Sequence, residues 1–415
     1  MKGNIKNLLL GCVGLLAINF LFAQRTCRSL EYQNQMLEQY PSLRDSLKLL
    51  ESFLSNRIAL AQRTQSPKII RIPVIVHILY HLPGENISDD LVKSQITALN
   101  RDYRKQNPDT TKIPLAFKPL AADCAIEFQL ATVDPGGAGT TGIVRKYTPI
   151  TKWTADDKIK SSAQMGDDGW DPKSYLNIWV GTLESLLGYS SMPGYPAGAD
   201  GVVISNKVFG ITKSGPFHQG RTAVHEVGHW LGLHHLWGDA DCGDDGVADT
   251  PKQQTFTNGC PSGIRTSCNN GPNGDMYMDY MDFTNDDCLV MFTEGQKEKM
   301  WGYFQPGGPR YSILSSNGLG VPTKEEAPVT EGSPKWLHVK IYPNPASSEL
   351  TLDVEFDARW LGKELTVLNA VGQLVFKKTI TSSIQTLNIR TLKPGIYFIC
   401  AEKEGDKIRE EFIKF

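Results

Sequence analysis

The sequence predicts an α/β domain followed by a small all-β sandwich, on the basis of chain length and two contrasting residue patterns. The 415 residues exceed one ordinary domain. Strand-like and helix-like patterns alternate through residues 66–318, which favours an α/β core. Residues 336–415 contain short alternating runs separated by turns, a pattern that is typical of a β-sandwich.

The composition is that of a globular protein and gives no sign of a nucleic-acid partner. Hydrophobic residues make up 40% and charged residues 21%, values that exclude collagen-like, polytopic membrane and wholly disordered chains. The 43 basic and 45 acidic residues give a net charge of −2, so a polyanion is not expected as the main partner.

Residues 1–23 have the pattern of a secretory signal peptide. Lys2 and Lys6 precede an apolar run from Leu8 to Phe22, and the small residue Ala23 follows. The run is shorter than the ~20 apolar residues of a spanning helix, so no stable transmembrane anchor is expected, although an anchor is the alternative. Export would leave seven Cys in a compartment where disulfides persist, and an odd number leaves one thiol unpaired.

The rest of the chain divides into four predicted segments. Residues 24–65 form a helical pro-segment in which Leu recurs at helical spacing, and residues 66–318 form the main domain. A stretch rich in Pro, Glu, Thr and Ser, residues 319–335, is a linker to the sandwich at 336–415. In the main domain, strands are expected at 69–76, 125–130, 176–180 and 202–204, and a helix follows Ser88.

The motif that carries chemistry is His225-Glu226-Val227-Gly228-His229-Trp230-Leu231-Gly232-Leu233-His234-His235, an HExxHxxGxxH pattern. Residues four apart share one helical face, so His225 and His229 can bind one ion beside Glu226. Gly232 can take a left-handed conformation that ends the helix and lets His235 supply a third ligand. Three His leave zinc a position open for water, which predicts a catalytic site; the alternative is a surface helix with paired His.

The extended motif resembles that of the metzincin metalloproteases, and residues 277–296 are similar to the pappalysin family among them. The resemblance implies a zincin domain with a mixed, twisted sheet and an active-site helix. It also implies a Met-turn below the zinc, at Met281 rather than Met278. Phe283 stands where the family usually has Tyr, which removes a phenol that could stabilise the tetrahedral intermediate unless Tyr280 replaces it.

The same resemblance implies two disulfides after the motif. It pairs Cys242 with Cys268 and Cys260 with Cys288. Covalent staples suit a Gly-rich and Asp-rich segment that has little apolar material to bury. A second metal cluster is the alternative, although these Cys lack CxxC spacing.

A calcium ion is also implied by the resemblance, with Asp245 and Asp249 as ligands in an acidic stretch that continues to Pro251. Hard carboxylate and carbonyl oxygens suit calcium. A solvated acidic loop is the alternative, because the sequence does not fix the ligands.

Cys27, just after the signal, is the candidate for the unpaired thiol. Related zymogens use a pro-segment Cys to occupy the open position of the zinc, and a thiolate binds zinc better than water does. The resemblance therefore implies a zymogen in which Cys27 is a zinc ligand in the latent form. A disulfide with Cys124 or Cys400 is the alternative.

Two features concern the substrate. Asp286 occupies the position where some family members hold a carboxylate at the bottom of the S1′ pocket, which implies cleavage before Arg or Lys, including self-cleavage before Arg57 or Arg63. Gly188 and Tyr189 resemble the metzincin edge strand that pairs with an extended substrate. An ordinary hydrophobic loop is the alternative for these two residues.

The tail carries Ile341-Tyr342-Pro343-Asn344-Pro345 and Gly395-Ile396-Tyr397-Phe398, which look like a type IX secretion sorting domain. The resemblance implies a Gram-negative host, recognition by the type IX secretion machinery, and a secreted or cell-surface location. A substrate-binding module is the alternative, since the pattern itself indicates only a small sandwich.

Together these features predict a secreted zinc endopeptidase, made as a zymogen, that acts on protein or peptide substrates. His225, His229 and His235 hold the zinc, and Glu226 moves a proton from the attacking water to the leaving amine. The alternative is a catalytically silent surface adhesin that keeps zinc for structure and binds through its β-domain. Glu226 argues against it, because a purely structural site has no use for a base.

Overall fold

The computed structural model describes residues 27–61, 69–324, 339–354, 360–382, 384–403 and 406–415. The expected signal peptide, Arg63 and residues 325–335 of the expected linker lie outside these ranges. No helix in the described part of the chain is both long enough and apolar enough to cross a membrane.

The main domain is built on a six-stranded mixed sheet. Its strands run in the order β2-β1-β4-β6-β5, and β3 pairs with β1 beyond the end of β2. All pairings are parallel except that of β5 with β6, so the mixed sheet predicted from the sequence is confirmed. The strands are β1 (Ile70–Tyr80), β2 (Ile126–Leu130), β3 (Ile143–Tyr147), β4 (Leu176–Gly181), β5 (Gly188–Ser190) and β6 (Val202–Ser205).

Burial on both faces explains the composition of the central strands. Along β1 every residue except Arg71 is buried, and β4 and β6 are buried throughout. Strands covered on both faces need a nearly continuous apolar run, which is what residues 70–80 provide. Strand β2 alternates instead, as expected for a strand near an edge.

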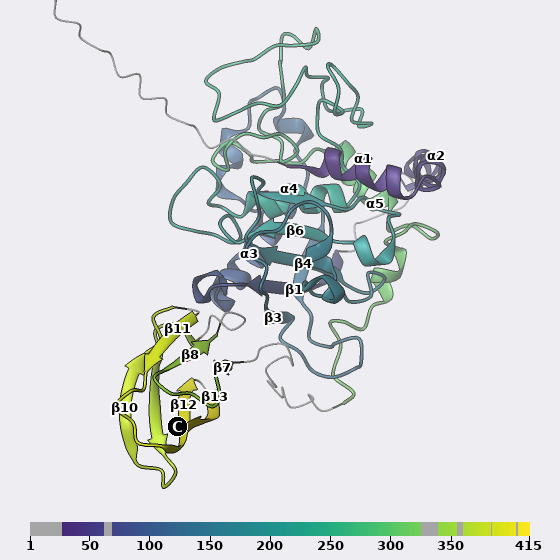
Figure 1. Cartoon of the computed structure of the whole chain (residues 1–415). Helices are drawn as coiled ribbons and strands as arrows, with labels where there is room; N and C mark the ends of the chain where they lie inside the picture. The colour runs from purple at the N-terminus through teal and green to yellow at the C-terminus, as the bar shows by residue number, and fades with distance from the viewer. Residues whose placement is uncertain (1–26, 62–68, 325–338, 355–359, 383, 404–405) are drawn as a thin grey trace, which may run out of the picture.

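The described part of the chain contains five α-helices, and α1, α3 and α4 contact strands of the sheet. The side chain of Ser88 accepts a hydrogen bond from the Leu91 amide at 3.2 Å, so the predicted helix start is confirmed. Figure 1 shows α4 lying along the sheet next to β6, with α1 of the pro-segment above it and α2 beside α5. The helices are α1 (Ser29–Gln39), α2 (Leu43–Ala61), α3 (Asp89–Tyr103), α4 (Arg221–Trp230) and α5 (Glu294–Gly302). Short 3₁₀ helices are η1 (Pro83–Glu85), η2 (Pro108–Lys112), η3 (Lys118–Leu120), η4 (Lys158–Lys160), η5 (Ser162–Gln164), η6 (Ala197–Ala199) and η7 (Tyr311–Ser315).

A buried ion pair fixes the C-terminal end of α4. Arg310 donates to both carboxylate oxygens of Asp200 at 2.9 and 2.7 Å and to the Trp230 carbonyl at 3.1 Å. The Trp230 indole donates to the same carboxylate at 2.6 Å, and the guanidinium lies 3.8 Å from the centre of the indole ring. Because Trp230 is the last residue of α4, these contacts hold the helix at the end where the motif turns back.

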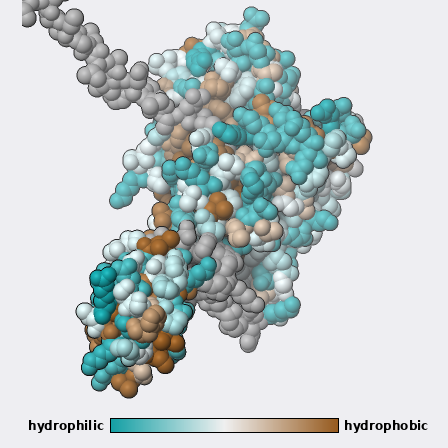
Figure 2. Space-filling view, viewed as in Figure 1, coloured by the Kyte–Doolittle hydropathy of each residue, from teal (hydrophilic) through white to brown (hydrophobic). Residues whose placement is uncertain are grey.

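The tail forms two antiparallel sheets that enclose their own core. One sheet has the order β10-β9-β12-β13 and the other β11-β8-β7, which confirms the predicted all-β architecture. Figure 1 shows these strands, coloured from green to yellow, as a body apart from the main sheet, and Figure 2 shows apolar surface gathered on it. The strands are β7 (Lys340–Tyr342), β8 (Glu349–Asp353), β9 (Glu364–Asn369), β10 (Leu374–Thr379), β11 (Ile384–Asn388), β12 (Gly395–Lys403) and β13 (Asp406–Lys414).

Three strands, β3, β11 and β13, were not anticipated from the sequence. Residues 406–414 read Asp-Lys-Ile-Arg-Glu-Glu-Phe-Ile-Lys, and this charge content hides a strand that pairs with β12 over its whole length. Such strands are stabilised by their neighbour rather than by their own residue preference.

Candidate metal and active site

Helix α4 and the turn after it bring three imidazoles together. His225 and His229 lie one turn apart on α4, and the helix ends at Trp230. Gly232 follows with φ of +88°, so the predicted left-handed conformation is confirmed. A Cβ at this glycine would overlap the ring of Tyr303, so close packing excludes a side chain there as well. The reversal returns the chain so that His235 faces the two helical imidazoles.

The distances among these groups fit a zinc ion. His229 Nε2 lies 3.2 Å from His225 Nε2 and 3.1 Å from His235 Nε2, and Cys27 Sγ lies 3.7 Å from His229 Nε2. A tetrahedral zinc holds its nitrogen ligands about 3.3 Å apart and a sulfur about 3.6 Å from each nitrogen. Among the described residues, these four are the ones identified as a group able to hold a metal ion.

The second nitrogen of each ring is held by an oxygen acceptor. His225 Nδ1 donates to the Tyr280 carbonyl at 2.7 Å, and His229 Nδ1 donates to the Leu233 carbonyl at 2.8 Å. His235 Nδ1 donates to the Asp239 carboxylate at 2.5 Å. A carbonyl can only accept, so the proton sits on Nδ1 and the Nε2 lone pair faces the site. Burial, together with the neighbouring His235, lowers the pKa of His229, which keeps this ring in the neutral form that binds metal.

Met281 lies directly beneath the helix. A Cβ on Gly228, between the two helical His, would come within 2.5 Å of Met281 Sδ. The glycine in the motif therefore makes room for this side chain, and the position agrees with the choice of Met281 as the Met-turn residue. Met278 is also buried, but it pairs with the next segment through its carbonyl, which accepts from the Val290 amide at 2.7 Å.

Glu226 lies between the metal-binding group and strand β5. Its Oε2 accepts from the Ser29 hydroxyl at 3.1 Å and lies 3.6 Å from Cys27 Sγ. A Cβ on Gly188 would lie 2.9 Å from Glu226 Cγ and 3.0 Å from Oε1. Gly188 is thus the residue that lets the edge strand pass this close to the carboxylate, and Ser29 is a contact that the sequence did not reveal.

Phe283 occupies the side of the site, and Tyr280 does not replace the missing phenol. The Phe283 ring centre lies 5.6 Å from that of His225 and 5.0 Å from that of His235. Tyr280 instead turns into the core, where its ring packs 4.8 Å from Phe292 and 5.5 Å from the Arg221 guanidinium. In this conformation neither side chain supplies a hydroxyl to the metal-binding group.

The pro-segment crosses the site along the edge strand. Cys27 forms a parallel bridge with Gly188, the Arg28 amide donates to the Gly188 carbonyl at 3.4 Å, and the Ser190 amide donates to the Ser29 hydroxyl at 3.2 Å. Strand β5 is therefore an edge strand and not an irregular loop. The Tyr189 side chain is fully buried on the far side of this strand, so only its backbone faces the cleft. Cys27, Cys124 and Cys400 form no disulfide, which removes that alternative for Cys27.

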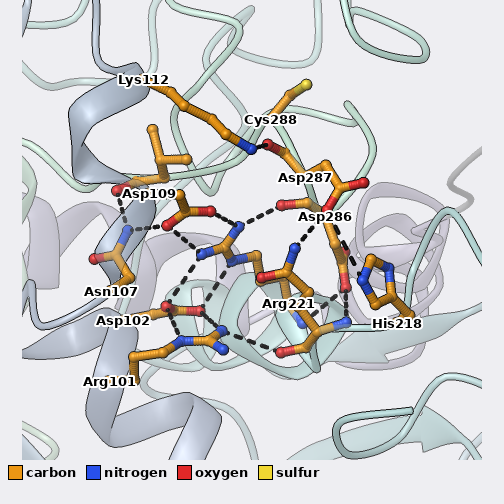
Figure 3. Close-up of polar contacts among 12 residues, drawn as sticks. Arg101, Asp102, Asn107, Asp109, Lys112, His218, Arg221, Asp286, Asp287 and Cys288 are labelled. Atoms are coloured by element: carbon orange, nitrogen blue, oxygen red, sulfur yellow. Dashed lines mark hydrogen bonds and ion pairs between the residues drawn. The ribbon is translucent and has the colours of Figure 1, made fainter. Parts of the chain in front are cut away.

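Asp286 is fully buried at the N-terminal end of α4 (Figure 3). Its carboxylate accepts from the Gln219 amide at 2.7 Å and from the Arg221 amide at 3.4 Å. Its own carbonyl accepts from the Arg221 guanidinium, which also binds Asp102 and Asp109. A carboxylate at this end of a helix interacts favourably with the helix dipole, and Arg221, whose amide it accepts from, lies one turn before His225.

The two predicted disulfides are present. Cys242 is bonded to Cys268 and Cys260 to Cys288, the pairing that the resemblance implies. The second bond anchors the segment that contains Asp286, because Cys288 lies two residues after it.

Asp245 and Asp249 already have hydrogen-bond donors. Asp245 accepts from the Thr250 hydroxyl at 2.8 Å and from the Val247 amide at 3.1 Å. Asp249 accepts from the Thr293 hydroxyl at 2.7 Å and from the Gly295 amide at 2.9 Å, so it binds the first turn of α5, whose N-cap is Thr293. Each carboxylate oxygen has two lone pairs, so these donors do not decide whether calcium binds here, and the calcium site stays a prediction.

Known proteins share both parts of the chain. The family described as "Pregnancy-associated plasma protein-A" matches residues 159–305, and the family described as "Secretion system C-terminal sorting domain" matches residues 340–414. An extracellular metalloprotease of Colletotrichum graminicola is 36% identical over 247 residues, which cover 57% of this chain and 76% of that protein. The chain belongs to the pappalysin family of metzincin metalloproteases.

Solved structures of pappalysins agree with this assignment. Mature mirolysin of Tannerella forsythia, in complex with a cleaved peptide, is 43% identical, covers 60% of this chain and 97% of its own, and gives a TM-score of 0.58. A promirolysin mutant of the same organism is 41% identical, covers 70% of this chain and 97% of its own, and gives a TM-score of 0.63. This pappalysin is therefore an extracellular zinc metalloendopeptidase with a tail for type IX export.

The hydrogen bond between His235 and Asp239 predicts that zinc affinity depends on the Asp239 carboxylate. Asp239→Ala removes the acceptor that fixes the ring, and zinc affinity is expected to fall by about tenfold to hundredfold. Competition of the purified protein with a zinc chelator measures this change. Asp241→Ala, at an exposed position of the same loop, is the control. Equal affinities for the two variants would contradict the role of Asp239.

Proposed function

We propose that this chain is a latent endopeptidase in which His225, His229 and His235 hold the catalytic zinc and Glu226 is the general base. The observation that carries the proposal is the spacing of 3.1–3.2 Å between His229 Nε2 and the other two imidazole nitrogens, next to a buried carboxylate. Bound zinc supplies a Lewis acid that polarises a peptide carbonyl and acidifies water.

The chain's own residues would do the remaining chemistry. Glu226 accepts a proton from the attacking water as the C–O bond forms, and it delivers that proton to the nitrogen as the C–N bond breaks. The backbone of β5 offers hydrogen-bonding groups to an extended peptide, which orients the scissile bond across the site. The outer hydrogen-bond partners of the three imidazoles fix the rings, so little reorganisation accompanies the reaction.

Latency follows in this proposal from three contacts of the pro-segment. The Cys27 thiol lies at the position of a fourth zinc ligand, the Ser29 hydroxyl binds Glu226, and the backbone from Cys27 to Ser29 covers the edge of β5. Each contact blocks a different requirement of hydrolysis: the water position, the base, and the substrate backbone. Removal of the segment would release all three together.

Cleavage before Arg or Lys is the substrate preference that we infer from Asp286. A carboxylate beside the substrate can form charge-assisted hydrogen bonds with the guanidinium of Arg or the ammonium of Lys, and an uncharged side chain does not make that contact. Asp286 contacts the first residue of α4, the helix that carries His225 and Glu226, and this supports a position for its carboxylate near the scissile bond. In the pro-segment, this preference allows cleavage before Arg57, near the end of α2. It also allows cleavage before Arg63, which lies outside the described residues.

The proposed substrates are proteins or peptides outside the cell, and the type IX machinery is the partner of the tail during export. The calcium ion implied by the sequence resemblance stays a prediction. The contacts of Asp245 and Asp249 lend it no support, and no step of the proposed reaction uses it.

Loss of the base tests the catalytic proposal. Glu226→Ala is expected to lower kcat about 10²–10⁴-fold, because the variant lacks the group that carries the proton. Its zinc content should stay unchanged, because all three His ligands are kept. Added trypsin removes the pro-segment from both chains, so that processing does not depend on their own activity, and hydrolysis of a peptide library is then measured. Glu411→Ala, an exposed position in the tail, is the control. Equal turnover by the Glu226 variant would favour the silent adhesin instead.

Asp286→Asn tests the substrate preference. The rate for peptides with Arg or Lys after the scissile bond is expected to fall by about tenfold to hundredfold relative to peptides with Leu there, because the charge that pairs with the cation is gone. The neighbouring Asp287→Asn, whose side chain is 58% exposed, is the matched control. A uniform loss for all peptides would show that Asp286 only caps α4.

Cys27→Ala tests the latch. The unprocessed chain is expected to show higher peptidase activity and faster processing, since a methyl group cannot occupy a zinc ligand position. Activity of the purified zymogen against a small peptide is followed with time, with Cys400→Ala in the tail as the control. An unchanged rate for the Cys27 variant would count against a zinc-bound thiol.

A further inference from the structure

The pro-segment buries one large side chain in a pocket that is separate from the metal-binding group. Tyr32, on α1, is only 2% exposed, and its hydroxyl donates to Asp157 Oδ2 at 2.5 Å. Its ring centre lies 5.0 Å from that of Tyr189 and 6.1 Å from that of Tyr195. The Lys160 ammonium lies 5.0 Å from the centre of the Tyr32 ring. This contact set is separate from the Cys27 and Ser29 contacts.

The lining of this pocket is held together without the pro-segment. Lys160 Nζ binds Asp157 at 2.8 Å and donates to the Ala199 carbonyl at 2.6 Å. The Tyr189 hydroxyl donates to the other oxygen of Asp157 at 3.3 Å. The ammonium also lies over the rings of Trp179 and Tyr189, at 5.5 and 5.1 Å from their centres. Because these contacts do not involve α1, the pocket would keep its shape when the pro-segment is removed.

The pocket has the character of a site for a phenol. Aromatic walls with one well-placed acceptor are typical of small ligand sites. A hydroxyl group can reach Asp157 Oδ2, whereas a phenyl ring would fill the walls and leave that carboxylate oxygen without its donor. Sites built to bind a hydroxyl reject the analogue that lacks it.

The pocket also lies next to the expected path of a substrate. Tyr189 contributes one wall with its side chain, while the backbone of the same strand, β5, faces the cleft. An extended peptide that pairs with β5 places alternate side chains on the two faces of the sheet, so the side chains on the face of Tyr189 would be directed toward this pocket.

We propose that the pocket formed by Asp157, Lys160, Tyr189 and Tyr195 is a binding subsite for a tyrosine side chain of peptide substrates, and that Tyr32 fills it in the latent chain as a second anchor. The inference rests on the proposed peptidase function, which it extends to a substrate feature away from the S1′ residue.

The first test uses the full-length chain. Tyr32→Phe removes the hydroxyl and keeps the ring, so the activity of the unprocessed chain is expected to rise on the order of tenfold, as for loss of one hydrogen bond to a charged group. Tyr40→Phe, at the exposed end of α1, is the matched control and should leave latency unchanged. Equal latency in the two variants would overturn the anchor.

The second test uses the processed enzyme and pairs of peptides that differ only by Tyr or Phe at one position. Scanning each position on both sides of the scissile bond is expected to find one where Tyr raises kcat/KM on the order of tenfold over Phe. Asp157→Asn should bring that ratio close to one.

Equal rates for Tyr and Phe peptides at every position in the unaltered enzyme would overturn the subsite, whether or not the Asp157 variant folds. A Tyr preference that survives Asp157→Asn would likewise overturn the assignment of Asp157. No hydrolysis of any peptide would overturn the proposed function itself, an outcome that is distinct from hydrolysis without a Tyr preference.

Discussion

Three imidazole lone pairs directed at one point are the constraint on which the site depends. Two nitrogens at 3.1–3.2 Å from a third, all buried, repel one another unless a cation lies among them. Burial discourages a proton as that cation, so a metal ion is the arrangement that satisfies the geometry. The outer acceptors, the Tyr280 and Leu233 carbonyls and Asp239, then decide which nitrogen of each ring faces inward.

The position of α4 must be fixed as tightly as its side chains. At its C-terminal end, Arg310 and Asp200 hold the Trp230 carbonyl and indole, and at its start Arg221 ties the helix to Asp102, Asp109 and the Asp286 carbonyl. Buried ion pairs of this kind contribute little net stability, yet their directional hydrogen bonds select one placement of the helix. Beneath the helix, Met281 fills the space left by Gly228. The site is therefore held from both ends and from below.

Sequence patterns predicted the features that depend on neighbours along the chain. The His spacing, the left-handed Gly232, the Ser88 cap and the central strands are local. The structure confirms the last three of these, the Gly232 conformation, the helix cap and the strands. Family resemblance supplied the disulfide pairing and the choice of Met281. Ser29, Asp239 and Tyr32 were missed as site residues because Ser, Asp and Tyr are common, and nothing nearby in sequence indicates that Ser29 meets Glu226 or that Tyr32 meets Asp157. Strand β13 was missed because pairing with β12, not its charged sequence, makes it a strand.

The pro-segment is part of the second core of the main domain as well as a cover for the metal site. Tyr32, Met36 and Leu43 lie in one buried cluster with residues of the catalytic domain that include Trp179, Leu186 and Met192. Each fully buried side chain of this kind contributes about 1.5–3 kcal/mol, so these three together outweigh a single hydrogen bond. A thiol on the metal alone would leave the rest of the segment free to dissociate locally. Burial along α1 instead keeps Cys27 close to the imidazoles, which raises the effective concentration of the thiol there and would let one cysteine act as the proposed latch.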